Sequence, residues 1–484
     1  MIEELLSIGE TEASVKLQGM GFADGKGALK NLKLLSETPF SSHLESVVEG
    51  ALLSPSPDGA LNNLETIASG LSGSAITALM ADPLNIERLL TVCGSSPFLS
   101  NILTRDAALF HWLFSGGLFE TKDYPVFREE LRVRTDSIAD LDAMAKALRV
   151  YKQKEYLRIG TRDLVGLTNV EEVTMELSDL AGASLDCALE FSLKHHKGLY
   201  GSPFYKDEDG EAREAGVAVM GLGKLGGREL NFSSDIDIIY IYSTEKGETS
   251  GAPGKPETSL SLHAFFVKVS TMTGKLISSV TGDGFVFRVD LNLRPEGKSG
   301  EMANSLQSAE AYYESWGQSW ERAAMIKARP VAGDLSLGEE FLSMIRPFVF
   351  RRYLDFTAIE EVKTMKEKID LSLLRRNPDA IDVKLGAGGI REIEFFCQAL
   401  QLIHAGKNPE VRERNTLNAI GKLKLKGFIK ESEAAVLREG YVFLRNLEHR
   451  IQIVEGRQTQ MIPPRPAELE RLARMMGFRD IEGR

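Results

Sequence analysis

The sequence has little of what defines several classes of protein. Its three cysteines are far apart in 484 residues and form no Cys-x-x-Cys pair, so neither a disulfide framework nor a zinc site of that kind is predicted. No uninterrupted apolar stretch approaches the roughly 18 residues that a membrane-spanning helix needs. The first residues, MIEELLSIGE, lack the apolar centre of a secretory signal. These absences predict a cytoplasmic protein without a membrane partner.

A surplus of basic charge is also absent. The chain carries 58 Lys and Arg against 69 Asp and Glu, a net charge of −11. Proteins that bind nucleic acid generally need excess positive charge to displace counterions, so no nucleic-acid partner is predicted. A composition of 43% hydrophobic and 26% charged residues is ordinary for a folded protein. A length of 484 residues is too great for one ordinary core and predicts two or three domains.

Three regions differ in their residue patterns. Residues 1–195 place apolar side chains at three- and four-residue spacing, as in FLSNILTRDAALFHWLF, which predicts helices without any evident chemical constellation. Residues 196–334 contain strand-like stretches such as GVAVMGLG and DIDIIYIY. Residues 335–484 return to helical patterns, as in EAAVLREGYVFLRNLEHRIQIVEG. We therefore expect an α+β protein in which a mixed sheet is flanked by two large helical regions.

The stretch GLGKLGGRELNFSSDIDIIYIY, residues 221–242, supports two interpretations. Gly221, Gly223 and Gly226 form a G-x-G-x-x-G after an apolar strand, a pattern found in dinucleotide-binding turns. That motif requires a full crossover helix and an acidic residue at the end of the second strand. Here the connection from Gly226 to Asp235 is too short for such a helix, and the acid opens the second strand instead. The spacing therefore disfavours dinucleotide binding.

The second interpretation is a metal site for chemistry on a nucleotide phosphate. Asp235 and Asp237 alternate on a predicted strand and therefore share a face. Asp290, in the strand-like stretch FVFRVDLNLRP, offers a third carboxylate, and such oxygen ligands suit one or two Mg²⁺ ions. Gly223 and Lys224 follow a strand, where backbone N–H groups and a cation could meet phosphate.

Several of these residues also have a purely structural interpretation. Asp235 could cap a turn after Ser233 and Ser234 while Asp237 faces solvent, although the upstream glycine and the Asp-bearing strand downstream favour the metal site. Trp316 and Trp320 are spaced one helical turn apart and are expected in the core rather than against a nucleotide base.

The pattern of a glycine turn followed by Asp-x-Asp on a strand resembles the nucleotidyltransferase superfamily typified by DNA polymerase β. Five blocks between about residues 217 and 463 together resemble the bacterial glutamine-synthetase adenylyltransferases, which are also adenylyl-removing enzymes. The blocks are GLGKLGGRELNFSSDIDIIY, RVDLNLRPEGKSG, YYESWGQSWERAAMIKARPVAGD, VKLGAGGIREIEFFCQALQLIHAG and RNLEHRIQIVEGRQTQMIP. Residues 1–195 resemble that family only in their helical character.

The resemblance implies a fold, an activity and partners. Enzymes of that family contain two nucleotidyltransferase halves: the N-terminal half removes AMP from a tyrosine of glutamine synthetase by phosphorolysis, and the C-terminal half attaches it from ATP. This chain has one Asp-x-Asp block, and Glu392 in IREIEF stands where the transferring half tends to have Asp. Both features favour the N-terminal, adenylyl-removing half. The implied partners are glutamine synthetase, phosphate, ADP, the PII signalling protein and glutamine as an effector.

The resemblance also implies roles for individual residues. The catalytic, metal-binding carboxylates would be Asp235, Asp237 and Asp290. The predicted nucleotide- and phosphate-binding residues are Gly223, Lys224, Ser234, Arg294, Lys327 and Arg329. Ion pairs with neighbouring acids are an equal alternative for the last three. Two other functions remain open: adenylyl transfer from ATP, and a non-catalytic module that binds effectors.

Overall fold

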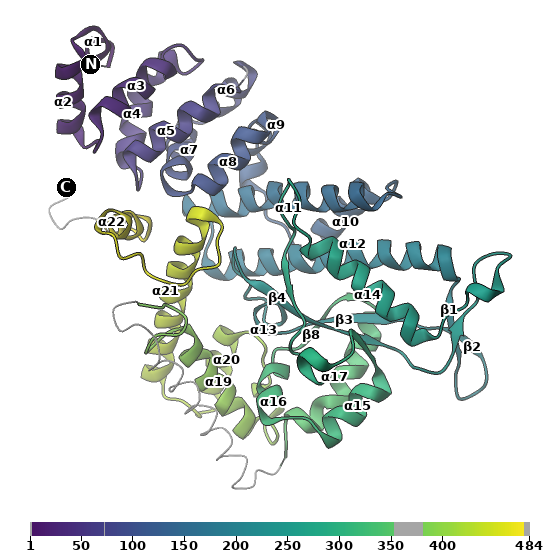
Figure 1. The fold of residues 1–484 in the computed structure, drawn as a ribbon. Helices are drawn as coiled ribbons and strands as arrows, with labels where there is room; N and C mark the ends of the chain where they lie inside the picture. Colours follow the sequence, from purple (N-terminus) through teal and green to yellow (C-terminus); the bar gives the residue numbers. More distant parts are fainter. Residues whose placement is uncertain (1, 72, 353–380, 479–484) are drawn as a thin grey trace.

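The computed structural model describes residues 2–71, 73–352 and 381–478. Its N-terminal part is helical as predicted, and Figure 1 shows these helices stacked in an array that leads to the sheet. The helices are α1 (Ile2–Ser7), α2 (Glu10–Met20), α3 (Gly25–Leu35), α4 (Leu44–Leu53), α5 (Pro57–Ala68), α6 (Gly73–Leu79), α7 (Leu84–Ser95), α8 (Pro97–Arg105), α9 (Ala107–Phe114), α10 (Tyr124–Thr135), α11 (Leu141–Leu164) and α12 (Val170–Tyr200).

Side-chain caps fix where several of these helices begin. Ser96 accepts a hydrogen bond from the backbone N–H of Leu99 at the start of α8, and Asp140 does the same for α11. Asn169 caps α12 through the N–H of Glu172. Such side chains satisfy N–H groups that have no partner within the helix, typically stabilising it by about 1 kcal/mol.

The central sheet is mixed, and its strand order is β6-β4-β3-β8. Strand β7 also pairs with β4, at the end of β4 that follows the part paired with β6. Strand β3 (Val217–Gly221) runs antiparallel to both β4 (Asp235–Tyr242) and β8 (Arg329–Gly333). Strands β6 (Arg288–Asp290) and β7 (Ala303–Ser305) run parallel to β4. Together with the helices this confirms the expected α+β fold with a mixed sheet.

Alternation along β4 separates two apolar cores. Ile236 and Ile238 belong to the large core shared with the N-terminal helices, whereas Ile239 and Ile241 belong to a second core on the opposite face. Helices α12 and α14 (Leu262–Ser278) pack together on the first side, and α17 (Leu335–Val349) packs on β3, β4 and β8. Because Asp235 and Asp237 have odd numbers like Ile239, they project to the second face.

The remaining elements surround this sheet. The C-terminal helices lie to one side of it in Figure 1, with α21 reaching up to α8. They are α15 (Leu306–Ser315), α16 (Ser319–Met325), α19 (Ile390–His404), α20 (Thr416–Leu425), α21 (Glu431–Glu455) and α22 (Pro466–Met475), while α13 (Gly223–Gly226) follows β3. A small separate sheet, in the order β2-β1-β5, contains β1 (Pro203–Lys206), β2 (Ala212–Glu214) and β5 (Glu248–Thr249).

Two expectations from the sequence differ from the structure. The stretch FVFRVDLNLRP is a strand only at β6, because the Arg294 guanidinium bonds the carbonyls of Leu291, Lys298 and Gly300 and holds a turn. Trp316 and Trp320 are 72% and 45% exposed, so the prediction that they pack in the core is wrong. Helix α15 ends at Ser315, which breaks the helical spacing between the two rings.

The expected region boundary at 195/196 lies inside α12, which continues to Tyr200, and the boundary at 334/335 falls at the start of α17. Among the described residues, no helix combines the length and the apolar character needed to cross a bilayer.

Candidate functional site

Two of the predicted carboxylates meet at the edge of the sheet. Strands β4 and β6 are parallel, and their register places Asp237 directly opposite Asp290 and Asp235 opposite Arg288. Side chains at opposite positions of neighbouring strands lie on the same face, within about 5 Å of each other at Cβ. The sequence separation of 53 residues between Asp237 and Asp290 is therefore closed by one short parallel pairing.

The glycine turn after β3 closes against Asp237. Gly223 has φ of +52°, and a Cβ atom added there would lie 2.5 Å from Oδ2 of Asp237. The backbone N–H of Leu222 donates to the carbonyl oxygen of Asp237 at 2.8 Å, which fixes the turn to the strand. Glycine is thus required both by the left-handed conformation and by the closeness of the carboxylate.

Crowding raises the proton affinity of Asp237. Burial, and then the charge of Asp290, raises the pKa of Asp237 to about 6, while Lys384 and Lys224 act to lower it. A half-buried carboxylate beside a second one is a site with excess negative charge that a divalent cation would relieve. The donor set, all carboxylate oxygen, suits Mg²⁺.

Asp235 is engaged elsewhere in this structure. Its Oδ1 accepts from Nε of Arg288 at 2.5 Å, and its Oδ2 accepts from Nε2 of Gln458 at 3.0 Å. Across the described ranges, no three His, Cys, Asp or Glu side chains form a group ready to hold a metal ion. The carboxylates thus occupy one sheet edge, with Asp235 turned to an arginine rather than to the other two.

Lys224 lies beside this edge, held by the C-terminal helix α21. Its Nζ donates to both carboxylate oxygens of Glu448, at 2.8 and 3.0 Å. Burial lowers the pKa of Lys224 to about 8, although the charge of Glu448 opposes that shift. An ammonium group with this pKa is still mostly charged at neutral pH, and it can be shared between Glu448 and a phosphate.

The other predicted phosphate ligands have internal partners. Lys327 is buried and donates to Glu229 at 2.5 Å and to Glu394 at 2.9 Å. Arg329 donates to the carbonyl oxygens at the end of α13, and Arg294 holds the loop described above. Ser234 donates to the side-chain oxygen of Asn231. The structure therefore brings Asp237, Asp290, Gly223 and Lys224 together. The other four predicted ligands bond to groups of the protein itself; they are Lys327, Arg329, Arg294 and Ser234.

Two residues near the carboxylates are not among the predicted site residues, and both lie outside the stretch of residues 221–242. Lys384 lies before α19 and lowers the pKa of Asp237 by its charge, and Glu448 on α21 orients Lys224. Both come from the helical C-terminal region, and each lies in one of the five family blocks. Only the folded arrangement shows that Lys384 lies near Asp237 and that Glu448 contacts Lys224.

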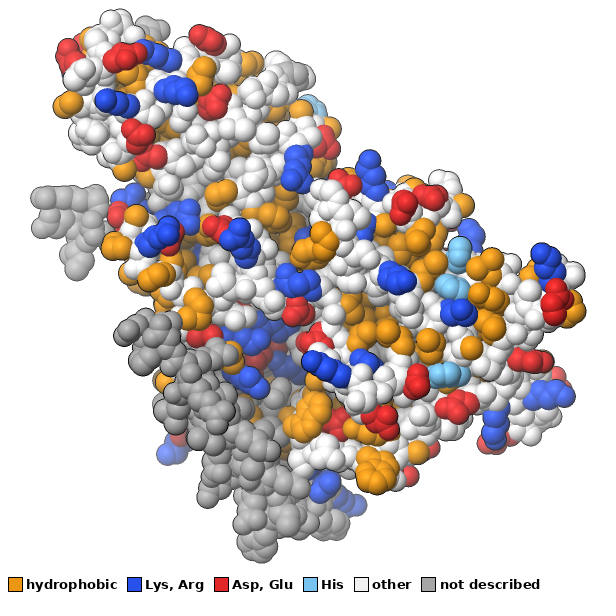
Figure 2. All heavy atoms as spheres, in the orientation of Figure 1, with side chains coloured by type: hydrophobic (Ala, Val, Ile, Leu, Met, Phe, Trp, Pro, Cys, Tyr) orange, Lys and Arg blue, Asp and Glu red, His pale blue; other side chains and the backbone are white. Residues whose placement is uncertain are grey.

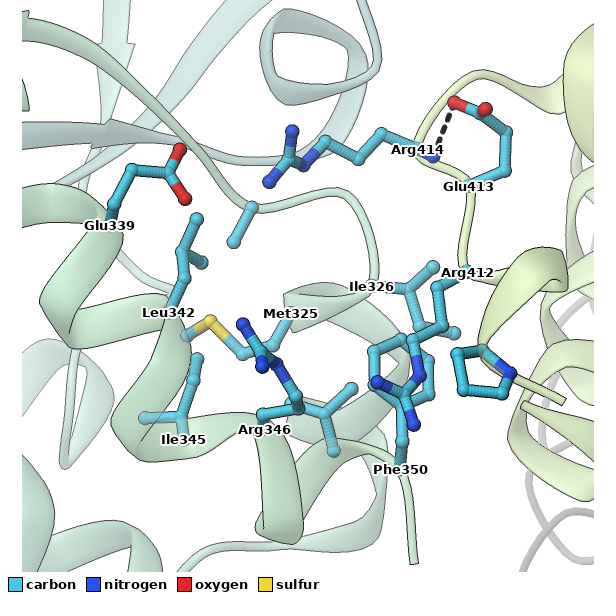
Figure 3. Close-up of a pocket in the computed structure, with 13 residues that line it drawn as sticks. Met325, Ile326, Glu339, Leu342, Ile345, Arg346, Phe350, Arg412, Glu413 and Arg414 are labelled. Carbon is cyan, nitrogen blue, oxygen red and sulfur yellow. Dashed lines mark hydrogen bonds between the residues drawn. The ribbon is translucent and has the colours of Figure 1, made fainter. Parts of the chain in front are cut away.

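Two cavities flank the sheet. The first, about 370 Å³, lies between α17 and residues 409–414, and Figure 3 shows the guanidinium groups of Arg346 and Arg414 directed into it. In the described part of the chain its lining includes none of the predicted site residues. The second, about 280 Å³, is lined by Ser233, Ser234 and Arg288 and so adjoins Asp235. On the face shown in Figure 2, acidic and basic side chains are interspersed among the described residues.

Comparison with known proteins gives two family matches. Residues 86–344 match the family described as glutamate-ammonia ligase adenylyltransferase, and residues 363–484 match the family described as GlnD PII-uridylyltransferase. The first match spans the helices from α7 onward, the carboxylate edge and α17.

The chain is similar to curated proteins named bifunctional glutamine synthetase adenylyltransferase/adenylyl-removing enzyme. The protein from Pseudomonas aeruginosa is 40% identical over 430 residues, which are 88% of this chain and 43% of that protein. The one from Pseudomonas putida is 39% identical over 420 residues, and the one from Rhizobium meliloti is 37% identical over 434 residues. These matches cover 86% and 87% of this chain and 42% of each relative, so the chain spans less than half the length of these relatives.

Proposed function

The chain belongs to the glutamate-ammonia ligase adenylyltransferase family, and we propose that it removes AMP from a tyrosine of adenylylated glutamine synthetase by phosphorolysis. The observation that carries this proposal is the pairing of Asp237 with Asp290 on adjacent parallel strands, against the turn at Gly223. That arrangement offers a cation and a nucleotide phosphate a common site. Glutamine synthetase is the enzyme that the family description calls glutamate-ammonia ligase.

The reaction is a displacement at phosphorus. An oxygen of inorganic phosphate forms a bond to the adenylyl phosphorus, and the bond from phosphorus to the tyrosine oxygen breaks. The tyrosine oxygen keeps the electron pair and takes up a proton, which yields ADP and the unmodified side chain. Such a reaction depends on positioning and charge neutralisation rather than on a covalent nucleophile.

The residues of the site have separable roles in this proposal. Asp235, Asp237 and Asp290 would hold one or two Mg²⁺ ions, which when bound supply charge neutralisation at the reacting phosphate oxygens. Gly223 lets the turn close against the Asp237 carboxylate, and Lys224 supplies a positive charge that Glu448 keeps in place. Binding of the cation requires Asp235 to share or leave its contact with Arg288.

The direction of the reaction is supported by the sequence around α19. Glu392 stands in IREIEF, and its carboxylate accepts from the backbone N–H of Gly388 at 3.0 Å, bracing the glycine turn before the helix. The transferring half of the family tends to have Asp at this position, so the glutamate supports removal of AMP as the proposed direction. We propose the PII signalling protein and glutamine as regulators, and the match of residues 363–484 to a family described as PII-uridylyltransferase supports the first of them.

The decisive experiment compares two reaction directions. The chain is incubated with adenylylated glutamine synthetase, Mg²⁺ and phosphate, and ADP is measured. In a parallel reaction, unmodified glutamine synthetase and ATP are supplied, and pyrophosphate and attached AMP are measured. ADP formation alone supports the proposal. Pyrophosphate formation alone assigns adenylyl transfer instead, and the absence of both products indicates a non-catalytic module.

Replacing one central carboxylate tests the site itself. We expect Asp237→Asn to reduce kcat for ADP release by at least about a hundredfold, because several kcal/mol of charge stabilisation are lost. The matched control is Asp209→Asn, an exposed carboxylate in the turn before β2, which should leave kcat unchanged. Full turnover by a folded Asp237→Asn protein would remove the carboxylate edge as the reaction centre.

A further inference from the structure

The second cavity has a composition that the carboxylate site does not explain. It lies where the N-terminal helices α8 and α11 meet the loop before β6 and the end of α21. Its cationic lining residues are Arg105, Lys152 and Arg288, against a single carboxylate, Asp283. Three positive charges around a cavity of about 280 Å³ favour an anionic ligand.

Lys152 is the central observation. Its side chain belongs to a residue only 8% exposed, and no carboxylate or hydrogen-bond acceptor contacts its ammonium group among the described residues. Nζ instead lies 3.8 Å from the ring centre of Tyr156 and 5.5 Å from that of Phe285. Burial, and then the charge of Arg288, lowers the pKa of Lys152 to about 7. A buried cation without an acid partner is costly, and an anion in the cavity would stabilise it.

The two arginines complete the positive lining. Arg105 ends α8, is exposed, and has no ion pair within the described chain. Arg288 uses Nε on Asp235 and Nη2 on the carbonyl of Ser233, which leaves Nη1 for another acceptor. The carboxylate of Asp283 interacts electrostatically with Arg149, which does not line the cavity. The backbone carbonyl of Asp283 accepts a hydrogen bond from the side chain of Gln153.

We propose that this cavity binds the inorganic phosphate consumed in the reaction, an inference that rests on the proposed function. Arg288 lines the cavity and donates to Asp235, whereas the glycine turn closes against Asp237. The attacking phosphate and the adenylyl phosphate can thus be held by different residues. The hydroxyl-bearing Ser233 and Ser234 at the cavity wall add polar groups suited to phosphate oxygens.

Lys152→Gln tests this directly, with Lys154→Gln as the matched control. Lys154 lies on the same helix and also stacks on an aromatic ring, 4.0 Å from the centre of Trp112, but it does not line the cavity. Binding of inorganic phosphate is measured by equilibrium dialysis without Mg²⁺ or nucleotide. We expect Lys152→Gln to weaken phosphate binding at least about tenfold, since a buried charge-assisted contact is lost, and Lys154→Gln to stay within about twofold.

Kinetics should show the same separation. Lys152→Gln should raise KM for phosphate by a factor similar to the loss of binding, with a smaller change in kcat. Because Arg105 is exposed, Arg105→Gln tests the cavity even if Lys152→Gln fails to fold, and we expect a loss of phosphate binding of about threefold or more.

Parallel binding measurements with AMP show whether the cavity binds inorganic phosphate or the phosphate group of the nucleotide. Unchanged phosphate binding in folded Lys152→Gln and Arg105→Gln proteins would overturn the proposal. So would a loss of AMP binding with phosphate binding intact, since the cavity would then hold the nucleotide. Phosphate binding that depends on Lys152, in a chain that forms no ADP, would support the anion site and contradict the proposed function.

Discussion

At the scale of single residues, Gly223 has little freedom to change. Its φ of +52° and the 2.5 Å that would separate an added Cβ from Oδ2 of Asp237 make any side chain doubly unfavourable. We expect Gly223→Ala to cost about 1–2 kcal/mol of folding free energy and to lower activity by at least about tenfold, because the carboxylate is displaced. Urea unfolding and ADP release measure the two effects.

The control for this change is Gly210→Ala. Gly210 has a similar φ of +84°, with no atom within 4 Å of an added Cβ. The part of the stability cost that comes from the positive φ should therefore be similar, while activity stays normal. Equal activity losses in the two variants would contradict a specific role for the contact between Gly223 and Asp237.

At the scale of elements, buried ion pairs join the C-terminal helices to the sheet. Lys327 precedes β8 and pairs with Glu229 and with Glu394 of α19. Lys327→Met would leave both acids buried without their cation, and we expect a loss of about 3–5 kcal/mol in the free energy of unfolding. Denaturant unfolding measures this loss.

An exposed pair provides the comparison. Lys424 of α20 contacts Glu431 at 3.1 Å, and both side chains are solvent-accessible. Lys424→Met should change stability by less than about 1 kcal/mol. A similarly small effect of Lys327→Met, together with a raised KM for phosphate, would return Lys327 to the role of a phosphate ligand.

A second buried pair predicts how stability depends on pH. Asp163 of α11 lies 2.7 Å from Nη1 of Arg450 on α21. Burial acts to raise the pKa of Asp163, but the charges and hydrogen bonds of Arg450 and His449 together outweigh it, and the pKa falls from 3.8 to about 2. Because the folded pKa is depressed, this contribution of about 2 kcal/mol is complete above about pH 4 and is lost as the pH falls towards 2.

Asp163→Asn tests that window. The variant should be less stable than the parent at pH 7, and its stability should fall less steeply between pH 4 and 2. The exposed pair of Glu12 and Lys16 supplies a control, since Glu12→Gln should leave the pH profile unchanged. An unaltered acid slope in Asp163→Asn would show that this carboxylate does not link α11 to α21 energetically.

At the scale of the whole molecule, one apolar core extends from the N-terminal helices to one face of the sheet. Ile453 of α21 belongs to that core, and the backbone carbonyl of Ile453 accepts from the hydroxyl of Ser96 at the start of α8. Gly160 of α11 packs against the same side chain. Helix α21 thereby ties the helical array to the edge of the sheet that carries the carboxylates.

We expect Ile453→Ala to lower the free energy of unfolding by about 2–5 kcal/mol through the cavity it leaves. Because Ile453 shares its core with the sheet, calorimetry should show the loss of stability in the same unfolding transition in which the sheet unfolds. Val436→Ala on the same helix is the control, since Val436 is 70% exposed and its truncation should be nearly neutral. A shift confined to a separate C-terminal transition would show that α21 unfolds independently.

Short-range patterns in the sequence specify the local elements and identify the family. The alternation in DIDIIYIY and the glycine turn after the preceding strand are consequences of short-range geometry, so they can be read from the residue order. The same short-range signals placed Asp235 and Asp237 on one face. They misplaced Trp316 and Trp320, because the end of α15 depends on its surroundings.

Which distant residues share a site depends on how the elements pack in the folded chain. The parallel register of β4 and β6 brings Asp290 opposite Asp237, and α21 brings Glu448 to Lys224. Lys152 is one lysine among many in a helical pattern, and its isolation from acids exists only where α11 meets the loop before β6. The reason is physical: burial, pairing and charge balance depend on neighbours that chain folding, not residue order, places around each group.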